Sequence, residues 1–308
     1  MRFESVKAIY KRALSDPKIF FLTGDLGHAH IDDFKKNLPH QYINVGIAEQ
    51  NLIGIAAGLA LSGNKVFVYS ITPFITMRCY EQIKVDVCYQ NVSVTVVGVA
   101  AGYAYSTCGC THHAIEDIAI MRALPNMRIY SPSNPIEAKQ LTEYLLDQSG
   151  PAYLRLGKGG EPTPDDTYPL NPPKGLIVQP GQDITLFSTG TILQEALQAA
   201  RLLQKNGISA EVINLHTIKP LDEDLIRNRV DSRSALFVLE EHTVMGGLGE
   251  AVARIMCEYT SSKKVIFKSF GVSDVYNHFS GSQEFMLKCA GLDAASVAIQ
   301  IVDMCKKI

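Results

Sequence analysis

The sequence lacks several features that would place it in a specialised class of protein. Its 29 Lys and Arg residues nearly balance 31 Asp and Glu residues, giving a formal net charge of -2. A charge this small gives no overall reason to expect nucleic acid or an acidic membrane surface as a partner. No uninterrupted apolar run is long enough to cross a bilayer, because even residues 52–61 are too few and include glycine.

Signs of secretion are also missing. Charged residues stand within the first seven positions, where a signal peptide would need an apolar core. The cysteine count, seven, is odd, which does not favour a disulfide framework. Most cysteines lie in apolar helical patterns and are expected to be buried reduced thiols, for example Cys79, Cys88, Cys257 and Cys305. These features predict a cytoplasmic protein.

What the sequence does contain is a regular alternation of strand-like and helical segments. At 308 residues it is long enough for two domains, each with its own core. Apolar β-branched segments predict strands at 19–23, 65–69, 92–99, 127–130, 152–156, 184–188, 210–215, 235–239 and 265–270. Helices are expected between most of them. This order predicts an α/β fold of two doubly wound domains with mainly parallel sheets.

One stretch interrupts the alternation. Residues 158–182 contain clusters of Gly, Pro and Asp and show neither the hydrophobic period of a helix nor that of a strand. This is typical of an interdomain linker. We therefore predict a first domain at residues 1–165, a linker at 166–182 and a second, smaller domain at 183–308.

Glu49 stands out because it is a single carboxylate in a segment of small and aliphatic residues. Residues 44–61 predict a buried helix in which Gly46, Gly54 and Gly58 permit close approach to the backbone. Burying an unpaired charge is costly, so Glu49 is expected either to pair or to take up a proton with a raised pKa.

A polar loop precedes the helix predicted at 115–122. It contains Cys108, Cys110, His112 and His113 within six positions. Zinc sites usually space their paired ligands more widely, so an active-site loop at the carboxyl end of the 92–99 strand is the favoured interpretation over a metal site.

Three further features lie at expected strand ends. The Gly-rich residues 245–250 lack the dinucleotide fingerprint and the P-loop lysine, so tight strand-to-helix packing is favoured over phosphate binding. Phe74 follows the 65–69 strand, where either a core or a ligand contact is expected. Arg155 ends the 152–156 strand, where it would either form an ion pair or hold a phosphate or carboxylate.

These pieces together resemble the transketolase family, and the resemblance covers essentially the whole chain. It rests on several ordered motifs: Gly46-Ile-Ala-Glu49-Gln, Tyr80-Glu-Gln-Ile, Thr111-His112-His-Ala-Ile-Glu116-Asp, Arg122-Ala-Leu-Pro-Asn126, Pro151-Ala-Tyr-Leu-Arg155 and, in the second domain, Ile213-Asn-Leu-His-Thr-Ile-Lys-Pro-Leu-Asp222 with Glu240-Glu-His242. The resemblance implies the family's pyrimidine-binding and carboxy-terminal domains.

The resemblance also implies roles for individual residues. Glu49 matches the glutamate that shares a proton with the aminopyrimidine of thiamine diphosphate and so activates the cofactor. Phe74 matches the ring stacked on the pyrimidine, and His112 matches a histidine near the reacting carbon and the donor hydroxyls. The remaining matches are Ile71 and Met77 at cofactor-contacting positions, and Arg155 and Arg2 at positions that bind substrate phosphate.

One element of the family is absent. The diphosphate-binding domain carries a Gly-Asp-Gly motif that holds the cofactor's diphosphate and its magnesium (or calcium), and this sequence has only Gly24-Asp25-Leu26. The resemblance therefore implies the carboxy-terminal subunit of a split transketolase. An amino-terminal, diphosphate-binding partner would supply the missing domain and hold the metal, in an expected α2β2 heterotetramer.

Two departures from the family pattern bear on the substrate. Cys108 replaces an aspartate that reads a sugar hydroxyl, and Ala100 replaces a substrate-contacting histidine. Losing a hydroxyl-binding carboxylate weakens discrimination, so we expect a modified or unusual sugar. The alternatives are a 1-deoxyxylulose-5-phosphate-synthase-like subunit, a 2-oxo-acid dehydrogenase beta-type subunit, or a non-catalytic scaffold subunit.

Overall fold

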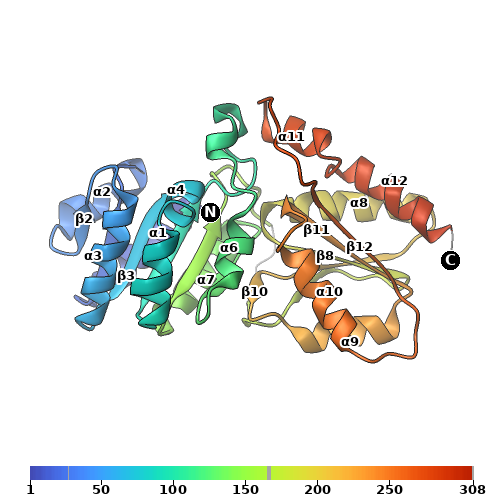
Figure 1. Cartoon of the computed structure of the whole chain (residues 1–308), viewed down its shortest axis with the longest axis horizontal. Helices are drawn as coiled ribbons and strands as arrows, with labels where there is room; N and C mark the ends of the chain where they lie inside the picture. The colour runs from blue at the N-terminus through green and yellow to red at the C-terminus, as the bar shows by residue number, and fades with distance from the viewer. Residues whose placement is uncertain (27, 165–167, 307–308) are drawn as a thin grey trace.

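Two β-sheets, each covered by helices on both faces, make up the chain (Figure 1). The computed structural model describes residues 1–26, 28–164 and 168–306. The first sheet has seven strands in the order β10-β5-β6-β4-β3-β1-β2, and the second has five in the order β12-β11-β8-β9-β7. Each sheet is parallel apart from one antiparallel edge strand, β10 or β7. The predicted α/β fold with two mainly parallel sheets is confirmed.

The first domain is built from short elements in alternation. Its strands are β1 (Ile19–Thr23), β2 (Tyr42–Asn44), β3 (Lys65–Ile71), β4 (Val94–Val99), β5 (Arg128–Tyr130) and β6 (Ala152–Leu156). Its helices are α1 (Arg2–Ala13), α2 (His28–Asn37), α3 (Glu49–Leu61), α4 (Thr72–Thr76), α5 (Tyr80–Gln82), α6 (Asp117–Ala123) and α7 (Pro135–Asp147). Three short turns of other helix types are η1 (Ile83–Tyr89, a π-helix), η2 (Ser106–Cys108) and η3 (Cys110–His112).

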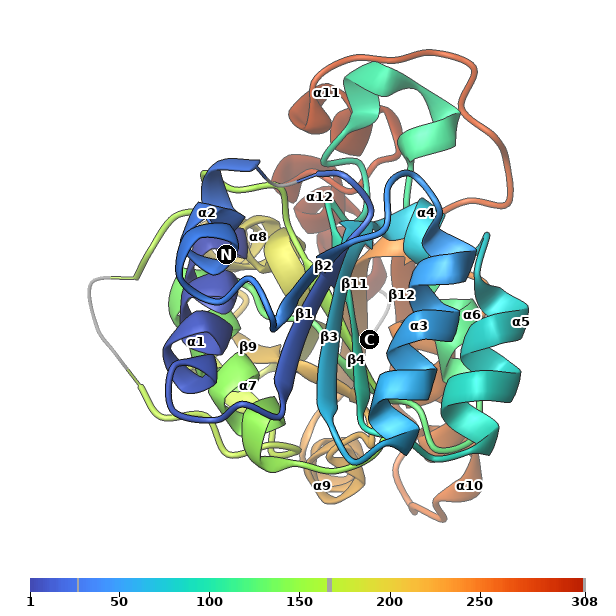
Figure 2. The ribbon, with the colours of Figure 1, turned by 90° about the vertical axis from the view of Figure 1, so that its left-hand side faces the viewer.

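Alternating side chains on β3 show why this sheet has two covered faces. Val66 and Val68 belong to a core that α3, η1 and α6 cover. Phe67 and Tyr69 point the other way, into a core covered by α1 and α7. In Figure 2 the two helix layers lie on opposite sides of the strands. With both faces buried, the strands read as continuous apolar runs.

The second domain repeats this arrangement. Its strands are β7 (Leu176–Gln179), β8 (Ile184–Ser188), β9 (Ala210–Asn214), β11 (Ala235–Thr243) and β12 (Ile266–Val272). Its helical elements are η4 (Gly190–Ile192), α8 (Leu193–Lys205), α9 (Glu223–Ser232), α10 (Leu248–Glu258), α11 (Gln283–Cys289) and α12 (Ala294–Cys305). One face packs against α8, α11 and α12, and the other against α9 and α10.

Two details differ from the predicted domain boundaries. Residues 176–179, assigned to the linker, form β7 at the edge of the second sheet. Residues 217–219 form β10 (Thr217–Lys219), which pairs with β5 of the first sheet although its neighbours in sequence belong to the second domain. The second half of the chain therefore completes the first sheet, which ties the domains together.

Three other expectations need correction. The sequence predicts a single helix from about Thr76 to Tyr89, but the structure divides this region into α4, α5 and the π-helical η1. Cys257 is exposed and Cys305 half-buried, although Cys79 and Cys88 are buried as predicted. Side chains built at Gly54 and Gly58 would meet nothing within 4 Å, so nothing in the described part of this chain packs closely against these glycines.

One stretch, Gln283–Cys305, is long and apolar enough to pass a length-and-hydropathy test for a membrane span. A turn at Gly291, where φ is 68°, divides it into α11 and α12. Val297 and Ile301 of α12 are buried in the second-domain core together with α8. A core helix passes the same test, so the stretch is only weak evidence for a membrane segment.

Candidate active site

Glu49 is the first residue of α3, and its carboxylate is buried at that helix end. Ser70, near the end of β3, donates its hydroxyl to Glu49 Oε1 at 3.1 Å. Arg78 donates from Nη1 to Glu49 Oε2 at 2.8 Å. The amino end of a helix favours a negative charge, and Arg78 neutralises it. Of the two outcomes expected for this carboxylate, the structure shows pairing.

Phe74 lies between this ion pair and the polar loop. It belongs to α4, which begins at Thr72 directly after β3 and has Pro73 in its first turn. The Arg78 guanidinium lies 4.7 Å from the centroid of the Phe74 ring, a cation–π contact made four residues further along the chain. Arg78 therefore touches both the Glu49 carboxylate and the Phe74 ring.

His112 approaches Phe74 from the loop that follows β4. The two rings lie 5.1 Å apart in an edge-to-face arrangement. Thr111 Oγ1 lies 3.0 Å from His112 Nδ1. The Tyr105 ring lies 6.4 Å from the His112 ring, measured between centroids, and the Tyr105 hydroxyl accepts a hydrogen bond from Arg2 Nη1 at 3.1 Å.

A continuous row of contacts therefore runs along the carboxyl edge of the first sheet. It joins Glu49, Arg78, Phe74, His112, Tyr105 and Arg2. Four of these residues were predicted from the sequence. The other two, Arg78 and Tyr105, were missed, although the four-residue spacing of Phe74 and Arg78 was a usable signal.

The remaining cofactor and substrate candidates lie on the same segments. Ile71 ends β3 and is half-buried, and Met77 follows α4 with 38% of its surface exposed. Cys108 is exposed in the His112 loop. Ala100 is buried with a φ of 62°, a left-handed backbone that is uncommon for a residue with a side chain.

Arg155 does not lie in this row, and of the two contacts expected for it the structure shows the ion pair. Only 3% of its surface is exposed. Its Nε donates to Asp117 Oδ2 at 2.7 Å, and its Nη2 donates to the carbonyls of Ala114 and Glu241. Tyr153 also donates its hydroxyl to Asp117, at 2.6 Å. The guanidinium thus links the two domains, out of reach of a substrate in this structure.

The Gly-rich segment also has a structural role. Glu240 of β11 accepts hydrogen bonds from the backbone N–H groups of Leu248 and Gly249, at the start of α10. Burial raises the pKa of Glu240 to about 7. A side chain at Gly247 or Gly249 would overlap Glu240 or Ser269, so close packing explains these glycines.

The part of the chain described by the structure contains no group of three or more His, Cys, Asp or Glu side chains that could hold a metal ion. In the polar loop, Cys108 and Cys110 are exposed, whereas His113 is buried with its ring 5.0 Å from that of Tyr103. Burial lowers the pKa of His113.

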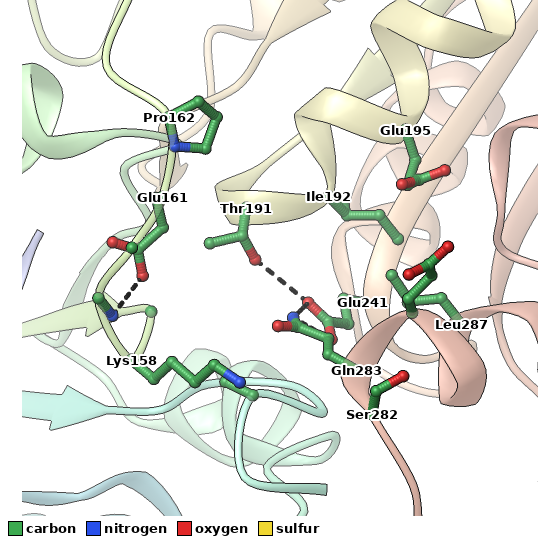
Figure 3. Close-up of a pocket in the computed structure, with 15 residues that line it drawn as sticks. Lys158, Glu161, Pro162, Thr191, Ile192, Glu195, Glu241, Ser282, Gln283 and Leu287 are labelled. Carbon is green, nitrogen blue, oxygen red and sulfur yellow. Dashed lines mark hydrogen bonds between the residues drawn. The ribbon is translucent and has the colours of Figure 1, made fainter.

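A cavity of about 410 Å³ opens between the two domains (Figure 3). Its lining includes Lys158, Glu161, Thr191, Glu241 and Gln283. None of the predicted site residues lines it, so it is separate from the row of contacts that begins at Glu49.

The geometry can be compared with known proteins. Residues 1–162 match the family model "Transketolase, pyrimidine binding domain". Residues 173–297 match "Transketolase, C-terminal domain". The chain belongs to the transketolase family. The predicted recognition of this family's two domains is confirmed, as is the classification as a transketolase-type transferase subunit.

Relatives of this transketolase subunit match it over most of their length. It is 37% identical over 279 residues to a putative transketolase C-terminal section of Methanocaldococcus jannaschii, covering 89% of this chain and 86% of that protein. It is 34% identical over 298 residues to an apulose-4-phosphate transketolase subunit of Phocaeicola vulgatus, covering 96% and 94%. A 6-deoxy-6-sulfo-D-fructose transketolase subunit of Clostridium sp. is 33% identical over 301 residues, covering 96% and 92%.

Solved structures agree with this assignment. A structure described as "Split gene transketolase, inactive beta4 tetramer" superposes with a TM-score of 0.85 at 33% identity, covering 97% of this chain and 96% of that one. Transketolase from Campylobacter jejuni shares the fold, with a TM-score of 0.80 at 14% identity, but this chain spans only 46% of it. The transketolase subunit thus superposes on nearly the full length of the solved split-gene chain.

Proposed function

We propose that this chain is the pyrimidine-domain subunit of a two-chain, thiamine-diphosphate-dependent transketolase. The complex transfers a two-carbon ketol unit from a ketose to an aldose. The observation that carries this proposal is the buried Glu49 carboxylate beside Phe74 and His112. It lies in a chain that matches only the pyrimidine-binding and C-terminal domains of the family.

The residues present fit the pyrimidine end of thiamine diphosphate. Each carboxylate oxygen can accept more than one hydrogen bond, so Glu49 keeps acceptor capacity beside Ser70 and Arg78. Phe74 offers an aromatic surface for stacking, and Ile71 and Met77 flank it in sequence. Thiamine diphosphate, when bound, supplies the carbon nucleophile that carries the ketol unit.

Glu49 would hold a proton at a carboxylate oxygen and share it with the ring nitrogen of the aminopyrimidine. Proton sharing of this kind needs a group shielded from water, and only 2% of Glu49 is exposed. Ser70 and Arg78 fix the orientation of the carboxylate from two sides. Glu49 therefore serves as the positioned acid–base group.

His112 is the residue best placed to meet substrate hydroxyls. With Nδ1 beside Thr111 Oγ1, its Nε2 is left to exchange a hydrogen bond with the sugar. Arg2 is the second substrate candidate, because its guanidinium reaches the same row through Tyr105. Arg155 has no direct substrate role in this proposal.

The proposal includes a partner subunit that carries the Gly-Asp-Gly motif, which this sequence does not contain. The partner would hold the diphosphate and its magnesium or calcium, in an α2β2 assembly. Two observations on relatives support a two-chain enzyme: some are named as one subunit of a transketolase, and the solved split-gene chain is described as an inactive β4 tetramer. All seven cysteines are free thiols, which suits a cytoplasmic location.

We propose a modified or unusual sugar as substrate. Cys108 and Ala100 stand where the family pattern has substrate-reading polar residues. Relatives at 33–36% identity are named for apulose 4-phosphate and for 6-deoxy-6-sulfo-D-fructose. These names support a departure from ordinary pentose phosphates without identifying the sugar.

A second candidate is a reaction of the 1-deoxy-D-xylulose-5-phosphate synthase type. Proteins with that name are 34% identical to this chain over 299 residues, although the chain spans only 46% of them. Their inclusion among the relatives makes a pyruvate donor worth testing, and the same donor would also reveal a 2-oxo-acid dehydrogenase beta-type subunit.

The decisive experiment is reconstitution. This chain is purified and assayed alone, then with the product of a neighbouring reading frame that bears Gly-Asp-Gly. Ketose donors, including branched and 6-deoxy-6-sulfo sugars, are compared with pyruvate. We expect turnover only from the mixture and only with ketose donors. Full activity of the isolated chain would refute the two-chain proposal, and a preference for pyruvate would favour the second candidate.

A further inference from the structure

The loop that carries His112 is a compact unit with an exposed tip and a buried base. It covers residues 102–114, and its ends are joined by a backbone bridge between Gly102 and Ala114. The turns η2 and η3 fill the middle. Cys108 and Cys110 at the tip are exposed, whereas Tyr103 near the base is buried. Whatever holds the base therefore sets the orientation of the tip.

The first group that fixes the base of the loop is the Glu241 carboxylate, near the end of β11 in the second domain. It accepts a hydrogen bond from the Tyr103 backbone N–H at 2.8 Å. It also accepts from Thr191 Oγ1 at 3.2 Å and from Gln283 Nε2 at 2.9 and 3.1 Å (Figure 3). Three separate segments thus converge on one buried carboxylate.

Gly102 shows how closely Glu241 fits the base of the loop. Its φ is 62°, and a Cβ built there would overlap the Glu241 carboxyl group. Only glycine combines this left-handed backbone with room for the carboxylate. The contact between Gly102 and the Glu241 carboxyl group is therefore a closely packed part of the interface between the two domains.

The second group of contacts that fixes the base of the loop comes from the segment 273–282, which connects β12 with α11. Asn277 Nδ2 donates to the Tyr103 hydroxyl at 2.7 Å. Ser106 Oγ donates to the Gly281 carbonyl at 2.6 Å. In Figure 1 this connection rises beside the protruding loop of the first domain. Together, the contacts of Glu241 and Asn277 form a clasp on the base of the loop.

The far end of the loop is tied to the second domain as well. Thr243 of β11 donates its backbone N–H to the Ile115 carbonyl at 2.7 Å. Arg155 bridges the carbonyls of Ala114 and Glu241. The His112 ring, by contrast, faces Phe74 of the first domain. The loop is thus held from behind by one domain while its functional side chain faces the other.

We propose that the C-terminal domain positions His112 for the substrate, with Glu241 and Asn277 as the positioning residues. The proposal rests on the proposed function in taking His112 as a substrate-binding residue. It assigns the second domain a part in substrate recognition, although that domain contributes no residue to the row of contacts from Glu49 to Arg2. Cofactor binding at Glu49 is expected to be independent of this clasp.

The test uses variants that loosen the clasp without opening the core. Asn277→Ala and Tyr103→Phe each remove one side of the same hydrogen bond, and Glu241→Gln replaces an acceptor oxygen by a donor group facing Gln283. His278→Ala is the matched control, because His278 is exposed in the same segment and has no bonded partner among the described residues. Melting temperatures show which variants remain folded.

Two measurements are made on the reconstituted complex. Amide hydrogen exchange across residues 103–113 is expected to rise about tenfold in the clasp variants, the size that losing one hydrogen bond allows, and to stay unchanged in His278→Ala. The KM for the sugars is expected to rise by a similar factor in the same variants. The concentration of thiamine diphosphate needed for half-maximal activity should not change.

The outcomes separate this inference from the proposed function. Unchanged exchange in folded clasp variants would overturn the clasp, and raised exchange with unchanged KM would overturn the positioning of His112. A wild-type complex that turns over no ketose would refute the proposed function. The exchange measurement would still decide whether the second domain holds the loop.

Discussion

Two ion pairs in this molecule have nearly the same geometry and opposite surroundings. Glu49 and Arg78 meet at 2.8 Å, with side-chain exposures of 2% and 47%. Asp117 and Arg155 meet at 2.7 Å, with exposures of 0% and 3%. The first pair lies along the carboxyl edge of the first sheet, where its cation faces water. The second is sealed between the two domains.

The difference shows what makes a charged residue available for binding. Arg78 can leave Glu49 at a lower cost than Arg155 can leave Asp117, because water solvates the freed Arg78 guanidinium and only the Glu49 carboxylate stays buried. Arg155 cannot, because its removal from Asp117 would leave two unsolvated charges in the interior. A strand-end arginine is therefore a ligand-binding group only when its charge is not already satisfied inside the fold.

The largest expected effect concerns Glu49, in the ion pair that lies at the candidate active site. Glu49→Gln removes the group that shares a proton but keeps one acceptor oxygen for Arg78, while the new amide NH2 can donate to the Ser70 hydroxyl. Turnover of the reconstituted complex should fall by about 10²- to 10⁴-fold, the usual range for a positioned acid–base group. Steady-state kinetics measure it, with a melting curve as the control for folding. Unchanged turnover would support a non-catalytic scaffold.

The next largest effect concerns the buried ion pair of Asp117 and Arg155. Arg155→Met leaves Asp117 buried without its cation and should lower the free energy of unfolding by about 3–5 kcal/mol. Chemical denaturation measures this loss. Adding Asp117→Asn should restore part of it, because the uncompensated charge is then removed. If the Arg155→Met protein is fully stable and its KM is raised only for phosphorylated sugars, the result would support the predicted contact of Arg155 with substrate phosphate.

A pH experiment extends the comparison to another buried group at the domain junction. His216 follows β9, and burial lowers its pKa from 6.5 to about 4. Between these values the unfolded chain binds the proton and the folded chain does not, so stability falls as the pH drops from 6.5 towards 4. In the His216→Gln protein, the free energy of unfolding should fall by about 1–2 kcal/mol less between pH 7.5 and pH 5 than in the wild type. Denaturation at pH 7.5 and pH 5 measures it, and an identical loss in both proteins would contradict the assignment.

The smallest effect concerns the exposed cation of the first pair. Arg78→Met should lower the free energy of unfolding by about 1–2 kcal/mol, less than Arg155→Met because water partly screens the original pair. Arg12→Met is the matched control, since Arg12 pairs with exposed Asp147 at 2.7 Å. That control should cost under about 1 kcal/mol. Equal losses for Arg78→Met and Arg155→Met would erase the distinction between the two pairs.

Local signals were sufficient for much of the fold. The order Asn134-Pro135, with Glu137 following, predicts a capped helix start. Asn134 does cap α7, accepting the Glu137 backbone N–H at 3.0 Å, and Pro135 is the first residue of that helix. The apolar strands of both sheets lie close to their predicted positions. The short strands β2, β7 and β10 were not predicted, because few residues and an edge position leave little periodic signal.

The roles of the site residues were predicted from the family resemblance, and the predicted strand ends added only that Phe74 and the His112 loop lie at one edge of a sheet. Glu49, Phe74 and His112 meet along one edge because parallel strands end there together. Arg78 was missed because its role depends on contact with Glu49, 29 positions away. The Arg155 ion pair could not be assigned from the sequence, because its partner, Asp117, lies 38 positions earlier in the chain.

The sequence by itself determined the family, the order of strands and helices, and the residue types that chemistry requires at Glu49, Phe74 and His112. Only the tertiary structure decided which charges face water and which are sealed between domains. The reason is that burial and pairing join residues distant in the chain, as when Glu241 holds the backbone of Tyr103 across 138 positions. No local pattern of residues records such a contact.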